Sequence, residues 1–305
     1  MCSPSFRKLI AKGWTVPASS SSKIVQSMRK LWFLLLCLAL PHLSAPAQSN
    51  FFQKWESRTT RTQSVQPSWS TPVVAPYPML VQAFRFDVSR QITPALTPTW
   101  SYESNRGLNL VPGFNSQVDI YPPSYVQHNT ANTRDGFGDF GFLYKYRLLS
   151  ANEKHGNYLL SAQAVVIIPT GTYTNGSRAG SISPTLIGGK GFGKFDLITS
   201  LGGTLPTSQT LALGRSIAWN TTAQYHVGKY LWPELEDNAT FYSGGKNDGK
   251  MQNFLTPGIT LGKFKLHPRN TTSRLGLSLG AGMQIATSGF HTYNHNLVIT
   301  SRFLF

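Results

Sequence analysis

The sequence predicts an all-β protein, a closed antiparallel transmembrane β-barrel of the outer-membrane type with about twelve strands. Three observations predict this fold class. Stretches of about ten residues with alternating apolar and polar character recur between turn signals. The connections between these stretches differ in length in a regular way. Beyond residue 47 there is no apolar run long enough for a membrane-spanning helix.

The N-terminal residues have the features of an export signal. Met28 precedes two basic residues, an apolar run over residues 31–40 and the small-residue site Ala45-Pro46-Ala47. The apolar run is too short to cross a bilayer, as is typical of a secretory signal peptide. We therefore expect residues 1–47 to be a cleavable signal peptide, cut before Gln48, with translation starting at Met28.

The predicted mature chain is basic and has no cysteine. Both cysteines, Cys2 and Cys37, lie in residues 1–47, so no disulfide is expected. Of the 28 basic residues, six lie in residues 1–47, which leaves 22 basic against 12 acidic residues and a net charge of +10. These charges are spread thinly, without a block of about five or more. We therefore expect no nucleic-acid partner.

Residues 48–79 lack steady alternation and are rich in Ser, Thr, Gln and Pro. This composition predicts a flexible periplasmic segment before the barrel. The segment also carries Phe51, Phe52, Trp55 and Trp69, whose rings could instead dock in the mouth of the barrel.

The barrel is predicted over residues 80–305. Its clearest strand covers residues 140–148, where Phe, Phe, Tyr, Tyr and Leu share one face while Lys145 and Arg147 lie on the other. The twelve expected strands are residues 80–90, 96–102, 108–120, 140–148, 158–168, 182–189, 195–205, 213–227, 231–242, 252–264, 275–287 and 296–305. No helix is expected in the mature chain, because no segment has an amphipathic three-to-four spacing.

The connection lengths agree with a membrane barrel, which has short periplasmic turns and longer outer loops. Long connections are expected over residues 121–136, 169–180, 206–212 and 243–250. Short ones are expected over residues 103–107, 190–193 and 228–229, whereas residues 267–273 form a longer turn than this rule predicts.

The composition of the two strand faces favours a membrane barrel over a soluble β-sandwich. One face carries Phe, Tyr, Trp and Leu, and the other carries Gly, Ser, Thr, Asn and Gln, which are too small and polar for a sandwich core. In lipid, every strand edge must be paired, which only a closed barrel achieves.

The last strand indicates where the protein is assembled. Leu297, Ile299, Phe303 and the terminal Phe305 share one parity. This resembles the C-terminal signature by which bacterial outer-membrane barrels are recognised for assembly. We therefore expect location in a bacterial outer membrane, with membrane lipid, lipopolysaccharide and the barrel-assembly machinery as partners.

Several stretches resemble one family. The sequence Gly136-Phe-Gly-Asp-Phe-Gly-Phe-Leu-Tyr-Lys-Tyr-Arg-Leu-Leu149 is similar to the GxGD…KYRL stretch of the MetA-pathway phenol-degradation family. Ile168-Pro-Thr-Gly171, Trp232-Pro-Glu-Leu-Glu236 and Pro257-Gly-Ile259 match later stretches of that family in the same order. The resemblance covers about residues 136–305, and it implies a barrel of about twelve strands that takes up small, often hydrophobic or aromatic compounds.

Charged residues are predicted to face the barrel interior. Glu234 and Glu236 share the interior parity of one strand, and Lys145 and Arg147 share that of another. Two roles stay open: these charges select solutes in an open lumen, or they form a structural network that fills a small barrel. The predicted pore-lining residues are Asp139, Lys145, Arg147, Gln224, His226, Glu234, Glu236, Asn238 and Arg302. For Asp139, a role in the turn before its strand is the alternative.

No enzyme, cofactor or metal site is predicted. His291 and His295 lie near Ser288 and Tyr293, but no nucleophile motif surrounds them and no acidic or thiolate ligand accompanies them. No nucleotide-binding fingerprint is present in the mature chain. The expected function is passive passage of a small solute. The alternatives are a non-conducting structural or surface-binding barrel and an outer-membrane enzyme with its site at the rim.

Overall fold

The structure is a computed structural model that describes residues 46–305 apart from 104–105 and 271–272. The chain divides into two units, Met1–Lys54 and Trp55–Phe305. Nearly all of the predicted signal peptide lies outside the described residues. A helix, α2 (Pro46–Ser64), crosses the boundary between the units, and the second unit contains the whole barrel.

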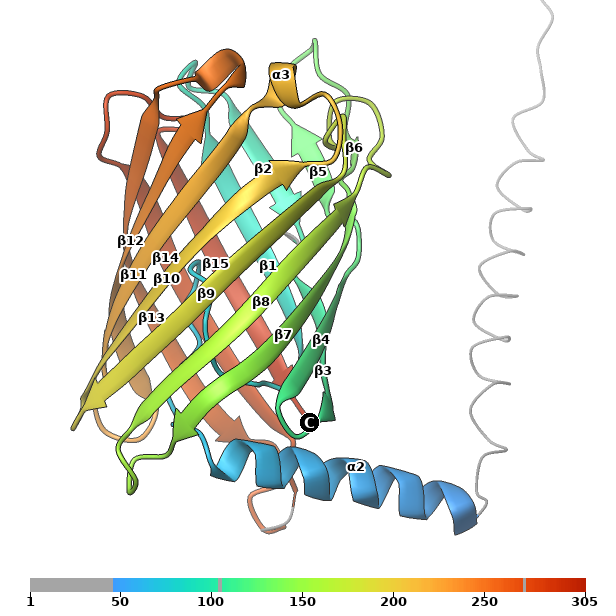
Figure 1. Cartoon of the computed structure of the whole chain (residues 1–305), viewed down its shortest axis with the longest axis vertical. Coiled ribbons are helices and arrows are strands. Elements are labelled where there is room, and N and C mark those ends of the chain that lie inside the picture. Colours follow the sequence, from blue (N-terminus) through green and yellow to red (C-terminus); the bar gives the residue numbers. More distant parts are fainter. Residues whose placement is uncertain (1–45, 104–105, 271–272) are drawn as a thin grey trace, which may run out of the picture. The chain divides into compact units, whose positions relative to one another are not determined.

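One antiparallel sheet makes up the wall of the second unit (Figure 1). Its strands are β1 (Ala83–Ile92), β2 (Pro98–Tyr102), β3 (Gly107–Gly113), β4 (Ser116–Tyr121), β5 (Tyr125–His128), β6 (Gly136–Phe137), β7 (Phe140–Ala151), β8 (Tyr158–Ile168), β9 (Ser181–Phe192), β10 (Phe195–Pro206), β11 (Arg215–Tyr225), β12 (Leu231–Ser243), β13 (Met251–Lys265), β14 (Gly276–Ala286) and β15 (His295–Leu304). The first and last strands pair from Ala83 opposite Leu304 to Ile92 opposite His295, which closes the sheet. This pairing gives the backbone of the first and last strands the partners that lipid could not provide.

These strands form twelve spanning segments, which confirms the predicted fold class. Three spanning segments are interrupted: β2 with β3, β4 with β5, and β6 with β7. Thus β1 pairs with β3 near Ala83 and with β2 towards Ile92. No described helix is long and apolar enough to cross a membrane.

The early strands differ from the prediction. Residues 108–120 were expected to be one strand and residues 103–107 a turn, but the turn lies at Phe114 and Asn115, where Gly113 pairs with Ser116. Residues 103–106 separate the two halves of one spanning segment instead. The Pro112-Gly113 pair and Asn115 are turn-forming residues, and this local signal outweighs the alternation that continues across them.

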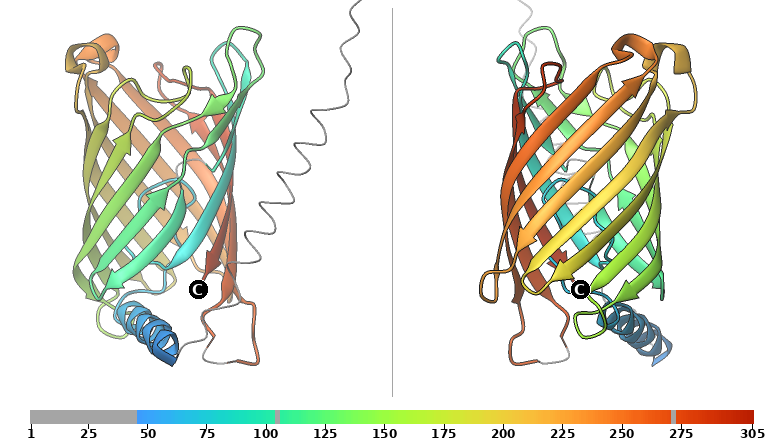
Figure 2. Two further views of the ribbon diagram at one scale, coloured as in Figure 1. Left: turned by 90° about the vertical axis from the view of Figure 1, so that its right-hand side faces the viewer. Right: turned by 60° about the vertical axis from the view of Figure 1, so that its left-hand side comes forward.

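The connections gather at two ends of the barrel. The loops after β8, β10 and β12 share one end, called here the α3 end because the loop after β10 contains the short helix α3 (Thr210–Leu213) (Figures 1 and 2). The loop after β12 carries a short 3₁₀ helix, Gly245–Asn247. Phe305 lies at the opposite end, called here the C-terminal end, together with the short turn between β9 and β10. The described parts of the connection between β13 and β14, residues 266–270 and 273–275, also lie at the C-terminal end.

The two faces of the wall have opposite character. On β7, Phe142, Tyr144 and Tyr146 are exposed on the outside, whereas Lys145 and Arg147 are 1% and 2% exposed on the inside. This is the predicted alternation, and it recurs around the wall. An aromatic and aliphatic exterior of this kind suits hydrocarbon rather than water.

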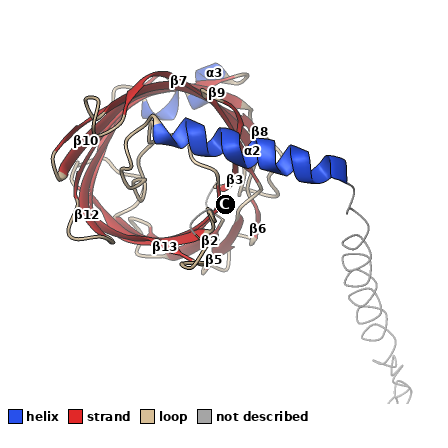
Figure 3. Cartoon of the chain, turned by 90° about the horizontal axis from the view of Figure 1, so that it is seen from below, coloured by secondary structure: helices blue, strands red, loops and turns tan. Residues whose placement is uncertain are grey.

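The polar segment before the barrel has a defined course, which corrects the prediction of a flexible segment over residues 48–79: its first part belongs to α2, and its second part occupies the interior of the barrel. After α2, residues 65–82, called here the internal segment, loop through the barrel (Figure 3). The helix was also not predicted, because its residues show no apolar stripe. Within it, the hydroxyls of Thr59 and Thr60 donate to the carbonyls four residues earlier, at 3.0 and 2.9 Å, so these polar residues are accommodated.

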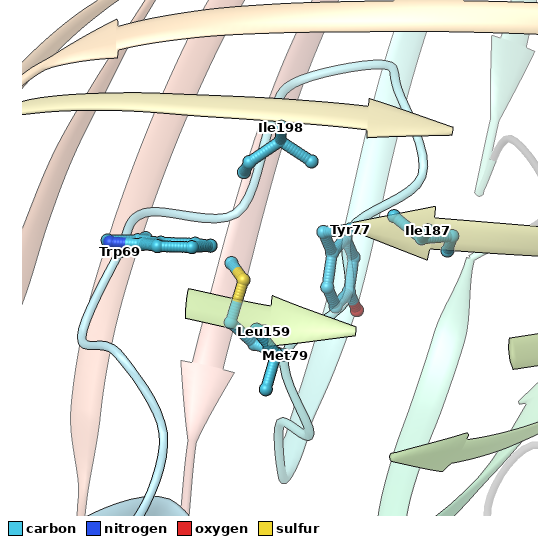
Figure 4. Close-up of a cluster of buried hydrophobic side chains, with 6 residues drawn as sticks. All are labelled: Trp69, Tyr77, Met79, Leu159, Ile187 and Ile198. Atoms are coloured by element: carbon cyan, nitrogen blue, oxygen red, sulfur yellow. The ribbon is translucent and has the colours of Figure 1, made fainter. Parts of the chain in front are cut away.

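An apolar cluster packs the internal segment against the wall (Figure 4). Trp69, Tyr77 and Met79 come from the segment, and Leu159, Ile187 and Ile198 come from β8, β9 and β10. Burial of these side chains holds part of the segment without any strand pairing.

Candidate functional site

Two carboxylates on β12 bind the backbone of the internal segment. Glu234 accepts the N–H of Val73 at 2.8 Å, and Glu236 accepts those of Val74 and Ala75 at 2.9 and 2.5 Å. The period of two along β12 points both side chains inward, where they are 5% and 0% exposed. Charge-assisted bonds to backbone N–H groups are among the stronger hydrogen bonds in proteins.

Three arginines bind the carbonyls of the same turn. Arg302 donates to Pro72 O at 2.7 Å, Arg85 donates to Val73 O, and Arg106 donates to Val74 O at 3.0 Å. Carboxylates thus bind the N–H groups and guanidinium groups bind the C=O groups of residues 72–75. These residues have no strand partner, and charged side chains around them take up their backbone hydrogen bonds instead.

Lys145 binds the next part of the internal segment. Its Nζ donates to Tyr77 O at 2.7 Å and to Met79 O at 3.3 Å, and it lies 3.9 Å from the centre of the Tyr77 ring. Ser161 Oγ donates to Pro78 O at 2.7 Å. These contacts supply the buried ammonium with oxygen partners and a ring face, which a desolvated charge requires.

Arg147 lies nearer the C-terminal end and binds the end of α2. Its Nη1 donates to Thr62 O at 2.7 Å, and its Nη2 donates to Phe114 O at 2.8 Å and to Asn115 Oδ1 at 2.9 Å. Arg147 therefore joins the helix to the turn between β3 and β4.

The other predicted interior residues contact one another or the loops. Gln224 donates to Glu234 Oε2 at 2.6 Å, and Asn238 donates to Asn220 Oδ1 at 3.0 Å. The His226 ring stacks on Trp232 with centroids 4.0 Å apart.

Asp139 has a different role from that predicted for a pore-lining residue. It accepts the N–H groups of Gly171 and Ser177 at 2.8 and 2.5 Å and the Ser177 hydroxyl at 2.6 Å. These bonds hold the loop between β8 and β9, so the structure favours a loop-anchoring role, close to the alternative of a turn residue. Asp139 directly precedes β7, at the α3 end.

Several interior residues were not predicted. Arg85 and Asp87 form a buried ion pair of 2.8 Å, and Arg106 Nε lies 3.3 Å from the same carboxylate. A signal for two of them was present, because Arg85 and Asp87 alternate with the outward-facing Phe84 and Phe86 along β1. Among the described residues, the contacts of the predicted interior charges agree with the structural network that was one of the two open roles. There, Glu236 and Lys145 both bind the internal segment rather than opposite charges.

Of the two histidines near the last loop, His291 makes structural contacts, and His295 is the first residue of β15. His291 Nδ1 lies 3.0 Å from Ser288 O, and its Nε2 lies 3.0 Å from Asn294 Oδ1. No group of three or more potential metal ligands occurs among the described residues.

Two cavities lie beside the internal segment. One, of about 260 Å³, is lined by residues 66–71 of the segment and by wall residues near the C-terminal end, such as Trp232 and Leu304. The other, of about 240 Å³, is lined by Pro76 and Tyr77 and by wall residues nearer the α3 end, such as Tyr121 and Ile167. The internal segment thus lies between a cavity towards the C-terminal end and a cavity towards the α3 end.

Comparison with solved structures supports the fold. The chain is similar to the crystal structure of the COG4313 outer membrane channel from Pseudomonas putida F1, with a TM-score of 0.51 and 16% identity, covering 76% of this chain and 100% of that chain. A NanC porin structure in a rhombohedral crystal form gives a TM-score of 0.48 and 8% identity, covering 73% of this chain and 100% of that chain. No protein-family model and no curated protein sequence matches this chain. At 16% identity, the likeness to the COG4313 channel structure shows the barrel fold alone.

Proposed function

We propose that this protein is a passive channel of the bacterial outer membrane whose lumen holds a resident internal segment. One observation carries the proposal: the charged interior residues bind a segment of the chain that has no strand pairing, with cavities on both of its sides. The apolar exterior and the similarity to a structure described as an outer membrane channel support it.

A segment held by side chains is suited to move without unfolding the wall. A typical hydrogen bond contributes about 0.5–1.5 kcal/mol net, and one to a charged group about 1.5–3 kcal/mol. The bonds of the segment to the wall can therefore be broken or exchanged without breaking the ladders between strands. Solutes would pass by diffusion through the space beside or behind it.

The route to the membrane is part of the proposal. The chain would be exported through the signal peptide over residues 1–47 and assembled by the barrel-assembly machinery, which would bind the strand ending in Phe305. Membrane lipid and lipopolysaccharide would cover the apolar exterior. We propose neither covalent chemistry nor a cofactor.

The resemblance to the MetA-pathway phenol-degradation family supports a solute class. The Gly136–Leu149 stretch that carries this resemblance contributes Lys145 and Arg147 to the interior. We propose that the solutes are small and hydrophobic or aromatic, as that family implies.

A non-conducting structural barrel is the second candidate. It is favoured by the complete burial of Glu236 and Lys145 in contacts with the internal segment. In that case the segment would be a permanent part of the core.

Single-channel recording in a planar bilayer tests these two functions. The wild type would be compared with the double variant Glu234→Gln/Glu236→Gln, in which one amide oxygen replaces each pair of accepting oxygens. We expect conductance steps in the wild type, and larger or longer openings in the variant because the segment is held less tightly. The matched control is Asp237→Asn, which removes an outward-facing carboxylate from the same strand.

The outcomes separate the candidates. A folded wild type and a folded double variant that both fail to conduct would contradict the channel and favour the structural barrel. If Asp237→Asn changed the conductance as much as the double variant, the effect would come from the loss of charge on β12 and not from release of the internal segment.

A further inference from the structure

The cavity on the α3 side of the internal segment has a mixed lining. Its volume is about 240 Å³, and Pro76 and Tyr77 of the segment form one side. The remaining lining comes from β1, β3, β4, β7, β8 and Arg106. Small-molecule sites are usually concave, with an apolar body and a few placed polar groups.

One wall of this cavity is apolar. Along the interior of β7 and β8, the pair Lys145 and Gln163 is followed towards the α3 end by Leu143 opposite Val165. Ile167 follows at the next interior position of β8, opposite Gly141, and its side chain packs over this glycine. The interior of these two strands therefore changes from polar at the level of the segment to apolar above it.

Another wall carries two arginines. Asp87 accepts Nε and Nη2 of Arg85 at 2.9 and 2.8 Å, and it lies 3.3 Å from Nε of Arg106. Arg85 is 3% exposed, and its Nη1 has no hydrogen-bond partner among the described residues. The Arg106 side chain is 27% exposed, so it is accessible from the cavity that it lines.

The other charges of the cavity already have partners. Lys145 Nζ donates to two carbonyls of the internal segment. Asp119 accepts Gln117 Nε2 at 2.8 Å and the Tyr121 hydroxyl at 3.4 Å. Arg85 and Arg106 also donate to Asp87 and to carbonyls of the internal segment, but Arg85 Nη1 has no partner among the described residues and Arg106 is partly exposed. These two arginines, rather than Lys145, are therefore the groups placed to bind an incoming anion.

We propose that this cavity binds a small carboxylate with an apolar body, such as a single-ring aromatic acid. The carboxylate would accept from Arg85 Nη1, which has no partner among the described residues, and from the exposed part of Arg106, since hydrogen bonds between ionised groups are among the stronger ones. The ring would pack against Leu143, Val165 and Ile167. A neutral aromatic compound would not supply a charged acceptor to Arg85 Nη1 and Arg106, and a small inorganic anion would leave the apolar wall in contact with water.

This site rests on the proposed channel for the route by which the acid arrives, but its binding does not require transport. The test is therefore equilibrium dialysis of radiolabelled benzoate against the refolded full chain in detergent. We expect saturable binding, with benzamide and acetate competing about tenfold or more weakly than unlabelled benzoate. Benzamide lacks the charge, and acetate lacks the ring.

Variants assign the binding to this cavity. Arg106→Gln is expected to weaken benzoate binding by about tenfold or more. Arg90→Gln, which changes an exposed arginine of β1 on the outside, is expected to leave it unchanged. If Arg106→Gln does not fold, Val165→Thr gives an independent test: it should weaken benzoate and leave acetate unaffected.

The result that overturns the proposal is equally specific. Benzamide or acetate binding as tightly as benzoate, or Arg106→Gln and Val165→Thr both binding like the wild type, would remove this ligand class. Benzoate binding without conductance would keep the site and contradict the channel. Conductance without benzoate binding would support the channel and contradict the proposed site.

Discussion

The barrel wall and the internal segment satisfy their backbone hydrogen bonds in different ways. In the wall, antiparallel ladders exchange N–H and C=O bonds between neighbouring strands, and the ladder between β1 and β15 closes the sheet. In the segment, side chains such as Glu236 and Lys145 take the place of a neighbouring strand. Ladder bonds do not depend on which side chains are present. One substitution should therefore leave the wall folded yet release part of the segment.

A single thiol on the internal segment would measure its release. The reporter is Val74→Cys in a full chain with Cys2→Ser and Cys37→Ser, because no other cysteine is present. The rate at which a maleimide labels this thiol follows the population of the released segment, and about 1.4 kcal/mol corresponds to a tenfold change. The change of gel mobility on heating reports whether the wall is folded.

The largest effect is expected from breaking the wall. Ile299 lies in β15, between Val88 of β1 and Ala281 of β14. Ile299→Pro removes an N–H from this doubly paired strand, so we expect loss of the heat-modifiable barrel. Ile299→Val is the control and should fold. A heat-modifiable proline variant would contradict the dependence of the wall on this ladder.

A smaller effect is expected from the apolar contact of the segment. Trp69 is 7% exposed and donates to Asn157 Oδ1 at 3.0 Å. Truncating a core Trp to Ala costs about 3–5 kcal/mol. Trp69→Ala should therefore raise thiol labelling by two or more powers of ten, roughly, while the wall stays heat-modifiable. Trp219→Ala, on the outside of β11, should not change labelling; equal effects would contradict a specific contact.

Removing one carboxylate should have the next effect. Glu236→Ala leaves the N–H groups of Val74 and Ala75 without their acceptor, at about 1–3 kcal/mol each when water does not replace it. Because water can enter beside the segment, we expect the total free-energy cost to lie near the lower end of this range. The variant should therefore be labelled faster than the wild type. Asp237→Ala is the control on the same strand. Unchanged labelling in Glu236→Ala would show that the segment is held elsewhere.

The smallest of these effects is expected at Lys145. Lys145→Met keeps the length of the side chain and loses the bonds to Tyr77 O and Met79 O, about 1.5–3 kcal/mol each. Most of this loss should be offset, because a charge no longer has to be buried. Labelling at residue 74 should rise less than in Glu236→Ala, because these carbonyls lie further along the segment. A rise equal to that of Trp69→Ala would make Lys145 the main anchor instead.

Sequence reasoning worked for the wall and failed at specific places in it. Alternation along β7 predicted which side of the sheet each residue faces, and Lys145 lies inside as expected. The hairpin at Gly113 and Ser116 was missed, because alternation continues across the turn. For the interior, Glu234 and Glu236 were predicted from parity, whereas the same parity was not applied to Arg85 and Asp87.

What the sequence by itself determined is the closed barrel with an apolar exterior and a polar interior. Its signal is local, since a period of two is read over about ten residues. Only the tertiary structure decided what the interior holds. Glu234 binds Val73 from 161 residues away, and the bonds are to backbone atoms, which leave no pattern in the residue types of the segment. A Ser, Thr, Gln and Pro-rich stretch therefore looks the same in sequence whether it is free in water or bound inside a barrel.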